Sequence, residues 1–177
     1  MLVVGVGMGS YFFFRYAAVG TVRLLITDPP AYDAGSQTYD PSIKDIVVTF
    51  TMVEIHAAQA GSDSGWHSLR VSSTDIHLLE VLNVAKVIGS ASLPTGKYDA
   101  IRLFANTVRV VIDGRNVTFR IPSGGQTGIK VPIVQGGFML SMGQTVNVLL
   151  TLSFNSHELL ANGTNITPVV RAEAVAP

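Results

Sequence analysis

The residues best suited to chemistry are few, because the 177-residue sequence contains four histidines and no cysteine. The lack of cysteine excludes a thiolate metal site, a cysteine nucleophile and a disulfide scaffold. Asp75-Ile76-His77 places a carboxyl and an imidazole on one face of an expected strand. A metal site needs three or four converging ligands, and no second close pair is visible. We therefore expect surface or hydrogen-bonded strand histidines, with no metal and no cofactor. The four histidines are His56, His67, His77 and His157.

Two short motifs resemble catalytic or nucleotide-binding loops but lack an essential residue. Asp63-Ser64-Gly65 has Asp63 where a nucleophile elbow needs the central serine. Gly5-Val-Gly7-Met-Gly9-Ser10 lacks the final glycine of a dinucleotide fingerprint, and no strand precedes it. Trp66 beside His67 is compatible with a sugar contact, although a single tryptophan in a β-domain is more often part of the core. We expect no enzymatic activity.

Acidic and glycosylation signals lie in the expected loops. Four aspartates surround one loop and are compatible with calcium, although a solvated acidic loop is the commoner explanation; they are Asp28, Asp33, Asp40 and Asp45. Three N-x-[ST] sequons fall at expected turns or strand starts, with their acceptors at Asn116, Asn162 and Asn165. If the chain reaches a compartment where glycosylation operates, these asparagines are predicted to carry glycans.

Composition limits the classes of partner. Twelve basic and twelve acidic side chains give a net charge of zero, so the chain has no electrostatic reason to bind nucleic acid. Only 14% of the residues are charged, whereas 47% are hydrophobic. This excludes a disordered chain and leaves apolar surface for a core, a membrane or neighbouring subunits.

Residues 1–20 form the most apolar stretch, with Arg15 as their only charged residue. As a helix this stretch would span about 30 Å, the thickness of a bilayer core. Three interpretations are open: a membrane anchor or leftover signal segment, a β-strand donated to a neighbouring subunit, and a helix that packs among its own copies. We expect the helix, although Gly5, Gly7 and Gly9 alternate with the period of a strand. The residues expected to drive polymerisation are Leu2, Val3, Val4, Val6, Met8, Tyr11, Phe12, Phe13, Phe14 and Tyr16.

The remainder, residues 21–177, is predicted to be one domain of short strands. In Thr21–Thr27 the apolar residues alternate, and Asp28-Pro29-Pro30 ends the strand. Asp113-Gly114 predicts a type I′ hairpin between Tyr98–Ile112 and Arg115–Ile121. Many strands with turn signals between them favour a mainly β fold, an antiparallel immunoglobulin-like β-sandwich with a helical N-terminal arm.

The order of several stretches resembles domain-of-unknown-function family 4382, which occurs on archaeal and bacterial surface proteins. The resemblance covers about 155 residues and implies an immunoglobulin-like or transthyretin-like sandwich with no established activity. Members often hang from the cell surface through a lipid-modified cysteine, which this sequence lacks. The matching stretches are GTVRLLITDPPAY, VVTFTMVEIH, GWHSL, TDIHLL, LPTGKYDAIRL, VIDG and ITPVV.

The N-terminal stretch resembles the hydrophobic segment of archaeal type IV-like pilins, which are processed just ahead of it. No basic residue precedes Leu2, which fits a processed pilin. The resemblance implies an extracellular filament subunit, inserted in the membrane before assembly, that forms a helical polymer of its own copies, for adhesion. The alternative is a membrane-anchored surface sandwich that binds a carbohydrate or a protein.

Overall fold

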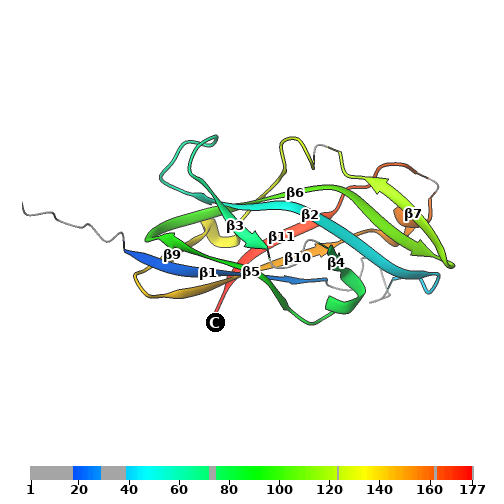
Figure 1. The fold of residues 1–177 in the computed structure, drawn as a ribbon, viewed down its shortest axis with the longest axis horizontal. Helices are drawn as coiled ribbons and strands as arrows, with labels where there is room; N and C mark the ends of the chain where they lie inside the picture. Colours follow the sequence, from blue (N-terminus) through cyan, green and yellow to red (C-terminus); the bar gives the residue numbers. More distant parts are fainter. Residues whose placement is uncertain (1–17, 29–38, 72–74, 123, 162, 177) are drawn as a thin grey trace, which may run out of the picture.

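The computed structural model of the chain describes residues 18–28, 39–71, 75–122, 124–161 and 163–176. This part of the chain is mainly β (Figure 1). Its strands are β1 (Val19–Thr27), β2 (Ile43–Ala57), β3 (Trp66–Val71), β4 (Asp75–His77), β5 (Lys86–Pro94), β6 (Gly96–Ile112), β7 (Arg115–Arg120), β8 (Ile129–Pro132), β9 (Phe138–Leu140), β10 (Thr145–Ser153) and β11 (Val169–Val175). Two 3₁₀ turns, η1 (Leu78–Val81) and η2 (Val134–Gly136), and one short helix, α1 (Ser156–Leu160), complete the described elements.

All of these strands belong to one curled sheet in the order β11-β10-β1-β5-β3-β2-β6-β7, with β4 added to β2 and with β8 and β9 added to β6. β1 runs parallel to β10, and the other strand pairs are antiparallel. The curl brings distant strands together. Ile133, which follows β8, forms a parallel bridge with Ala172 of β11. The result is a half-barrel whose long strands β2 and β6 cross over β1 and β10 (Figure 1).

The predicted antiparallel immunoglobulin-like sandwich is therefore wrong, while the mainly β prediction is confirmed. A sandwich needs two separate sheets, but here β3 pairs with β2 at Leu69 and with β5 at Arg70. The physical reason is that alternating hydrophobicity predicts which face of a strand is buried and not which strand lies beside it.

The predicted helical arm is also corrected. The predicted arm ends at Gly20, and its described residues Val19 and Gly20 form the start of strand β1 and are not helical. The single α-helix of the described residues is α1, which has five residues and lies near the other end of the chain. The predicted polymerisation residues, from Leu2 to Tyr16, lie outside the described residues.

The core fills the inside of the half-barrel. In β1, Val22, Leu24 and Ile26 are fully buried, as their alternation predicted. Burying a side chain of this size contributes about 1.5–3 kcal/mol, so the inner face of each long strand contributes strongly to folding. The largest buried side chains include Tyr98, whose hydroxyl donates to the Pro94 carbonyl at 2.8 Å.

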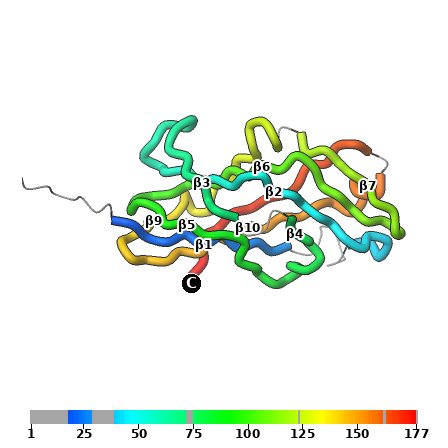
Figure 2. The backbone as a smooth tube through the Cα atoms, viewed as in Figure 1, coloured from blue at the N-terminus to red at the C-terminus, as the bar shows by residue number. Residues whose placement is uncertain are grey.

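The hairpin between β6 and β7 is confirmed. Asp113 and Gly114 both have positive φ angles, 48° and 77°, as a type I′ turn requires. Ile112 and Arg115 flank this turn as partners. The hairpin lies at one end of the long axis of the molecule, whereas β1 begins at the opposite end (Figure 2).

Candidate functional site

Charged and aromatic side chains meet on the outer face of β2, β3, β6 and β8. Because Val53 and Ile55 of β2 are buried in the core, the residues that alternate with them, Glu54 and His56, point to the outer face, where neighbouring side chains leave them only 9% and 7% exposed. The register then places Arg102 of β6 opposite Glu54, and Trp66 of β3 opposite His56. We call Glu54, His56, Trp66, Asp99 and Arg102 the outer-face cluster.

An ion pair and a cation–π contact hold the centre of the outer-face cluster. Arg102 donates through Nε (2.7 Å) and Nη2 to the same carboxylate oxygen, Oε2 of Glu54. Its guanidinium carbon lies 4.2 Å from the centroid of the Trp66 ring. The indole Nε1 of Trp66 donates to the Ser62 carbonyl at 3.1 Å. Trp66 is therefore a half-buried residue of the outer face and lies outside the core.

His56 is held at both ring nitrogens. Nδ1 lies 2.7 Å from Oδ1 of Asp99, and Nε2 lies 3.2 Å from the Gly61 carbonyl. Burial lowers the pKa of His56, but the hydrogen bonds to Asp99 and to the carbonyls of Gly61 and Ser64 outweigh burial and raise the pKa above its ordinary value. The imidazolium can donate to both acceptors at once, so His56 ties the loop of residues 57–65 to the sheet.

This histidine–aspartate pair lacks the geometry of a nucleophile and its base. The hydroxyl of Ser64 donates to the Gly61 carbonyl at 3.2 Å. Nε2 of His56, the nitrogen that would have to accept a proton from a serine, faces that same carbonyl. The arrangement positions a loop rather than activating an oxygen.

A cleft of about 340 Å³ adjoins the outer-face cluster. One wall is apolar, formed by Trp66, Ala100 and Pro132, and the polar rim includes Asp99 and Lys130. The Lys130 ammonium lies 5.9 Å from the centroid of the Trp66 ring. An aromatic wall with a carboxylate and an ammonium beside it suits a small polyhydroxylated ligand.

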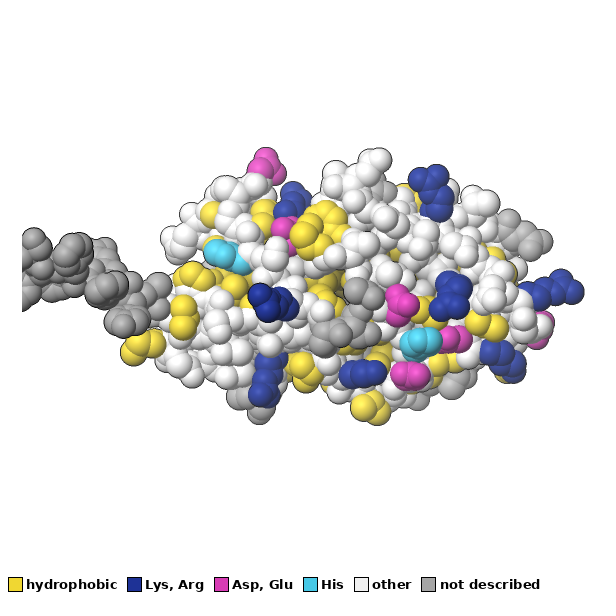
Figure 3. Space-filling view, in the orientation of Figure 1, with side chains coloured by type: hydrophobic (Ala, Val, Ile, Leu, Met, Phe, Trp, Pro, Cys, Tyr) yellow, Lys and Arg dark blue, Asp and Glu magenta, His cyan; other side chains and the backbone are white. Residues whose placement is uncertain are grey.

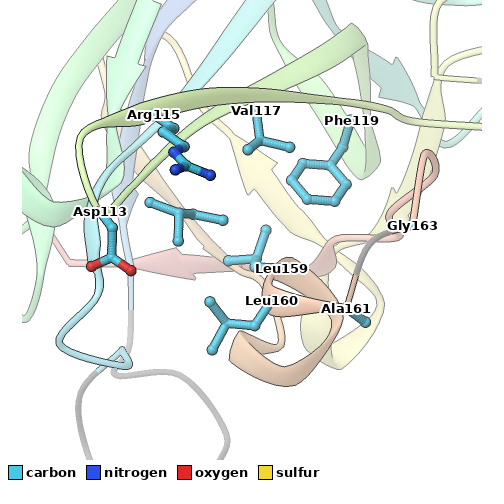
Figure 4. A pocket seen from close by; sticks show the side chains of 9 residues that line it. Asp113, Arg115, Val117, Phe119, Leu159, Leu160, Ala161 and Gly163 are labelled. Atoms are coloured by element: carbon cyan, nitrogen blue, oxygen red, sulfur yellow. The ribbon is translucent and has the colours of Figure 1, made fainter.

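A second hollow, of about 370 Å³, lies between the β6–β7 hairpin and α1. Val117 and Phe119 point into it from β7, and Leu159 and Leu160 approach from α1 (Figure 4). Asn155 caps α1 by accepting the His157 backbone N–H at 2.8 Å, which fixes the helix beside the hairpin. We call this hollow the β7 groove. Its remaining lining residues are Ile112, Asp113, Arg115, Ala161 and Gly163.

Apolar side chains are exposed at the other end of the molecule, where the chain enters β1. Val19 is 44% exposed, Met139 is 62% exposed and Met142 is 76% exposed. The Gly143 N–H donates to the Val19 carbonyl at 2.9 Å, which fixes the turn after β9 against the start of β1. Hydrophobic side chains are visible at this end of the surface (Figure 3). We call Val19, Met139 and Met142 the entry patch.

A buried acid lies at the end of β1. Asp28 is fully buried, and its Oδ2 accepts a 2.6 Å hydrogen bond from the Tyr39 hydroxyl. That hydroxyl also accepts the Phe154 N–H at 3.3 Å. Oδ1 of Asp28 has no hydrogen-bond partner among the described residues. Burial raises the pKa of Asp28 to about 7, although the Tyr39 hydrogen bond lowers it. Burial and the neighbouring Asp28 also raise the pKa of Tyr39.

Asp75 and His77, which the sequence places on one strand face, lie together on β4, and each has a hydrogen-bond partner on β2. His77 pairs with Asp45 of β2 at 2.8 Å, while Asp75 accepts a hydrogen bond from Thr49 at 2.7 Å. Asp40 binds the Ser42 backbone and hydroxyl. Within the ranges that the structure describes, no three His, Asp or Glu side chains form a metal-binding group. Asp33 lies outside those ranges.

Two of the three predicted glycosylation acceptors are described, and both are exposed. Asn116 lies on β7, and Asn165 forms a bridge with Arg120. Asn162 lies outside the described residues. Glycosylation at these asparagines stays a prediction.

The outer-face cluster and the β7 groove were both missed from the sequence. Glu54 and Arg102 are 48 residues apart, and only the register of β2 and β6 brings them together. For α1 a signal does exist, since Asn155 is followed three residues later by Glu158, as in an N-terminal capping box.

Comparison with known proteins identifies a family and no activity. A family model described as "Domain of unknown function (DUF4382)" matches residues 19–167. No curated protein and no solved structure matches the chain. No helix in the described part is long and apolar enough to cross a membrane.

Proposed function

Because the chain belongs to the DUF4382 family, whose description assigns no activity, we propose its function from its geometry. The chain is a structural, pilin-like subunit of an extracellular cell-surface filament, and it polymerises through its hydrophobic N-terminal segment. It acts by assembly and adhesion rather than by catalysis.

One observation carries this proposal: large apolar side chains are exposed at both ends of the long axis, Val19, Met139 and Met142 at one end and Leu160 at the other. In sequence, the apolar N-terminal segment leads into β1 at the entry patch. The β6–β7 hairpin, which lines the β7 groove, lies at the opposite end of the molecule from the start of β1 (Figure 2). Two different surfaces at opposite ends favour a head-to-tail contact, which generates an open helix when the rotation does not close a ring.

The energetics are sufficient for such an assembly. Burying ~1,000 Å² of apolar surface from the segment would give a gross gain of about 25 kcal/mol, before the costs of ordering and association. The low charge of the chain also limits repulsion between copies. Before assembly, the same apolar segment would hold the subunit in the membrane.

Electron microscopy of protein sheared from the native cell surface tests this function. We expect regular filaments that contain the chain when they are identified by mass spectrometry. Deleting residues 1–17 should abolish the filaments and release folded domains. Dispersed particles in the membrane fraction, with no filaments from the native chain, would contradict the proposal.

A second candidate function has an observation of its own, the cleft beside Trp66. In this alternative the chain is a membrane-anchored surface domain that binds a carbohydrate. Trp66 is the only tryptophan, so its fluorescence reports directly on the cleft. Titration with a panel of sugars should shift the emission of the native chain, and Lys130→Ala should weaken binding. Emission that stays constant with every sugar would argue against this candidate.

A further inference from the structure

We propose that residues 2–8 of one copy add as a β-strand to the open edge of β7 in the next copy, with their large side chains in the β7 groove. This inference rests on the proposed filament and specifies how its subunits join.

The edge of β7 presents backbone groups to a partner strand. The Arg120 N–H donates to the Thr164 carbonyl, and the Arg120 carbonyl accepts the Ile166 N–H. Both backbone groups of Arg120 therefore point away from β6. Backbone groups alternate in direction along a strand, so those of Asn116 and Thr118 point to the same outer side. Among the described residues no strand pairs with that stretch of the β7 edge. A strand placed there would gain main-chain hydrogen bonds.

The groove beside that edge receives side chains. Val117 and Phe119 face inward from β7, and α1 closes the other side with Leu159 and Leu160 (Figure 4). Alternate side chains of a strand added to β7 would point to this same inner face. Leu160 is 38% exposed, so an apolar side chain in the groove would cover it.

The sequence of the segment fits such a strand better than it fits a helix. With a period of two, the large residues Leu2, Val4, Val6 and Met8 fall on one face. The opposite face consists of Val3, Gly5 and Gly7. A helix would spread both sets around its circumference. The strand presents its large apolar face to the groove and its small face to the outside.

Chain length makes the contact intermolecular. From Met8 to Val19 the chain can extend over at most about 40 Å. The entry end lies near Gly96 of β6, and the open edge lies opposite Arg109 and Val111, 13 and 15 residues along the same strand, or about 43–50 Å. A segment therefore falls short of its own groove and reaches that of a neighbour.

Cysteine cross-linking in the full chain tests the contact, since the native sequence has no cysteine. Val4→Cys or Val6→Cys, each combined with Leu160→Cys, is produced in the native cell and oxidised mildly with copper-phenanthroline. We expect a ladder of disulfide-linked oligomers on non-reducing gels. The matched controls, Gly5→Cys or Gly7→Cys with Leu160→Cys, place the thiol on the opposite face and should give at least five-fold less cross-linked product.

The outcomes separate this inference from the proposed function. Native filaments without the ladder, or with equal ladders from both faces, would overturn strand addition and leave the filament standing. If the native chain forms no filament, the proposed function fails and the inference fails with it.

If the cysteine variants do not assemble, a second pair of variants tests the same contact. Leu160→Arg should block assembly by putting a charge in the groove, whereas Val84→Arg, at a 62% exposed site outside the groove, should assemble normally. Equal assembly of both variants, or equal loss in both, would overturn the inference.

Discussion

The outer-face cluster and the β7 groove differ in how far their groups are satisfied within the chain. In the cluster, Arg102 and Glu54 neutralise each other, and His56 has an acceptor at each nitrogen. In the groove, apolar and polar side chains line a hollow that no described residue fills, beside a strand edge that is open among the described residues. The cluster has more chemically active residues, but the groove has more backbone groups and side chains available to a partner. Unsatisfied groups are therefore the better guide to an interaction surface.

The largest effect expected from this difference concerns filament growth. A Leu160→Arg subunit keeps its N-terminal segment but has a blocked groove, so it should add to a growing end and then stop it. Mixed with the native chain, it should shorten filaments several-fold, as a chain terminator does in a head-to-tail polymer. Electron microscopy of filament lengths measures this effect.

The matched comparison is Arg102→Ala in the cluster, which should assemble into filaments of native length. Equal shortening by Arg102→Ala and Leu160→Arg would remove the functional distinction between the two regions.

The second effect concerns Asp28. Its Oδ1 has no hydrogen-bond partner among the described residues, but unlike the groove it is fully buried. Its pKa is about 7 in the folded chain and 3.8 as its ordinary value, so the folded state binds the proton more tightly. The stabilising contribution is complete below pH 3.8 and is lost as the pH rises through 7. Three pKa units correspond to about 4 kcal/mol. Urea unfolding between pH 4 and pH 8 measures the change.

Asp28→Asn supplies the control, because the amide keeps the shape of the acid without its charge. We expect this variant to lose most of the pH dependence and to be more stable than the native chain at pH 8. An unchanged slope would show that Asp28 does not titrate in this range.

The third effect tests how far the cluster depends on pairing. In Arg102→Ala the Glu54 carboxylate, whose side chain is 12% exposed, loses its partner. We expect the free energy of unfolding to fall by about 2–3 kcal/mol. Arg109→Ala on the exposed side of the same strand should change it by less than about 0.5 kcal/mol.

A double variant, Glu54→Gln with Arg102→Ala, should recover part of the stability lost in Arg102→Ala, because the buried charge is then removed. No recovery would assign the loss to packing of the Arg102 stem on Trp66 rather than to the ion pair.

The sequence predicted the features that depend on local patterns and missed those that depend on contacts between distant segments. Alternation in Val22, Leu24 and Ile26 reports directly on burial, and Asp113-Gly114 reports on a local turn, so β1 and the hairpin were predictable. The pairing of β1 with β10 joins Thr21 to Thr145, and no local pattern encodes such a contact. The sandwich prediction failed for this reason.

The candidate sites were less predictable than the fold because each depends on two distant segments. The β7 groove needs β7 and α1 together, and the outer-face cluster needs the register that sets Arg102 opposite Glu54. The spacing of Asp75 and His77 placed both on one face of a strand, but it could not identify their partners, which lie on β2. Only the register of β2 with β4 supplies those partners.

The smallest effect concerns the loop that His56 holds. Because hydrogen bonds to Asp99 and to two carbonyls raise its pKa above 6.5, His56 stabilises the folded loop fully below pH 6.5 and loses this contribution as the pH rises through the folded-state pKa. Hydrogen exchange of residues 57–65, corrected for intrinsic rates, should show protection falling with pH by about 1 kcal/mol or less. His56→Gln should make the protection independent of pH in this range, whereas His157→Gln, an exposed histidine on α1, should behave like the native chain. If the loop of His56→Gln kept the native pH dependence, a group other than His56 would control the stability of the loop, and the cluster would be less fully engaged in structure than its hydrogen bonds indicate.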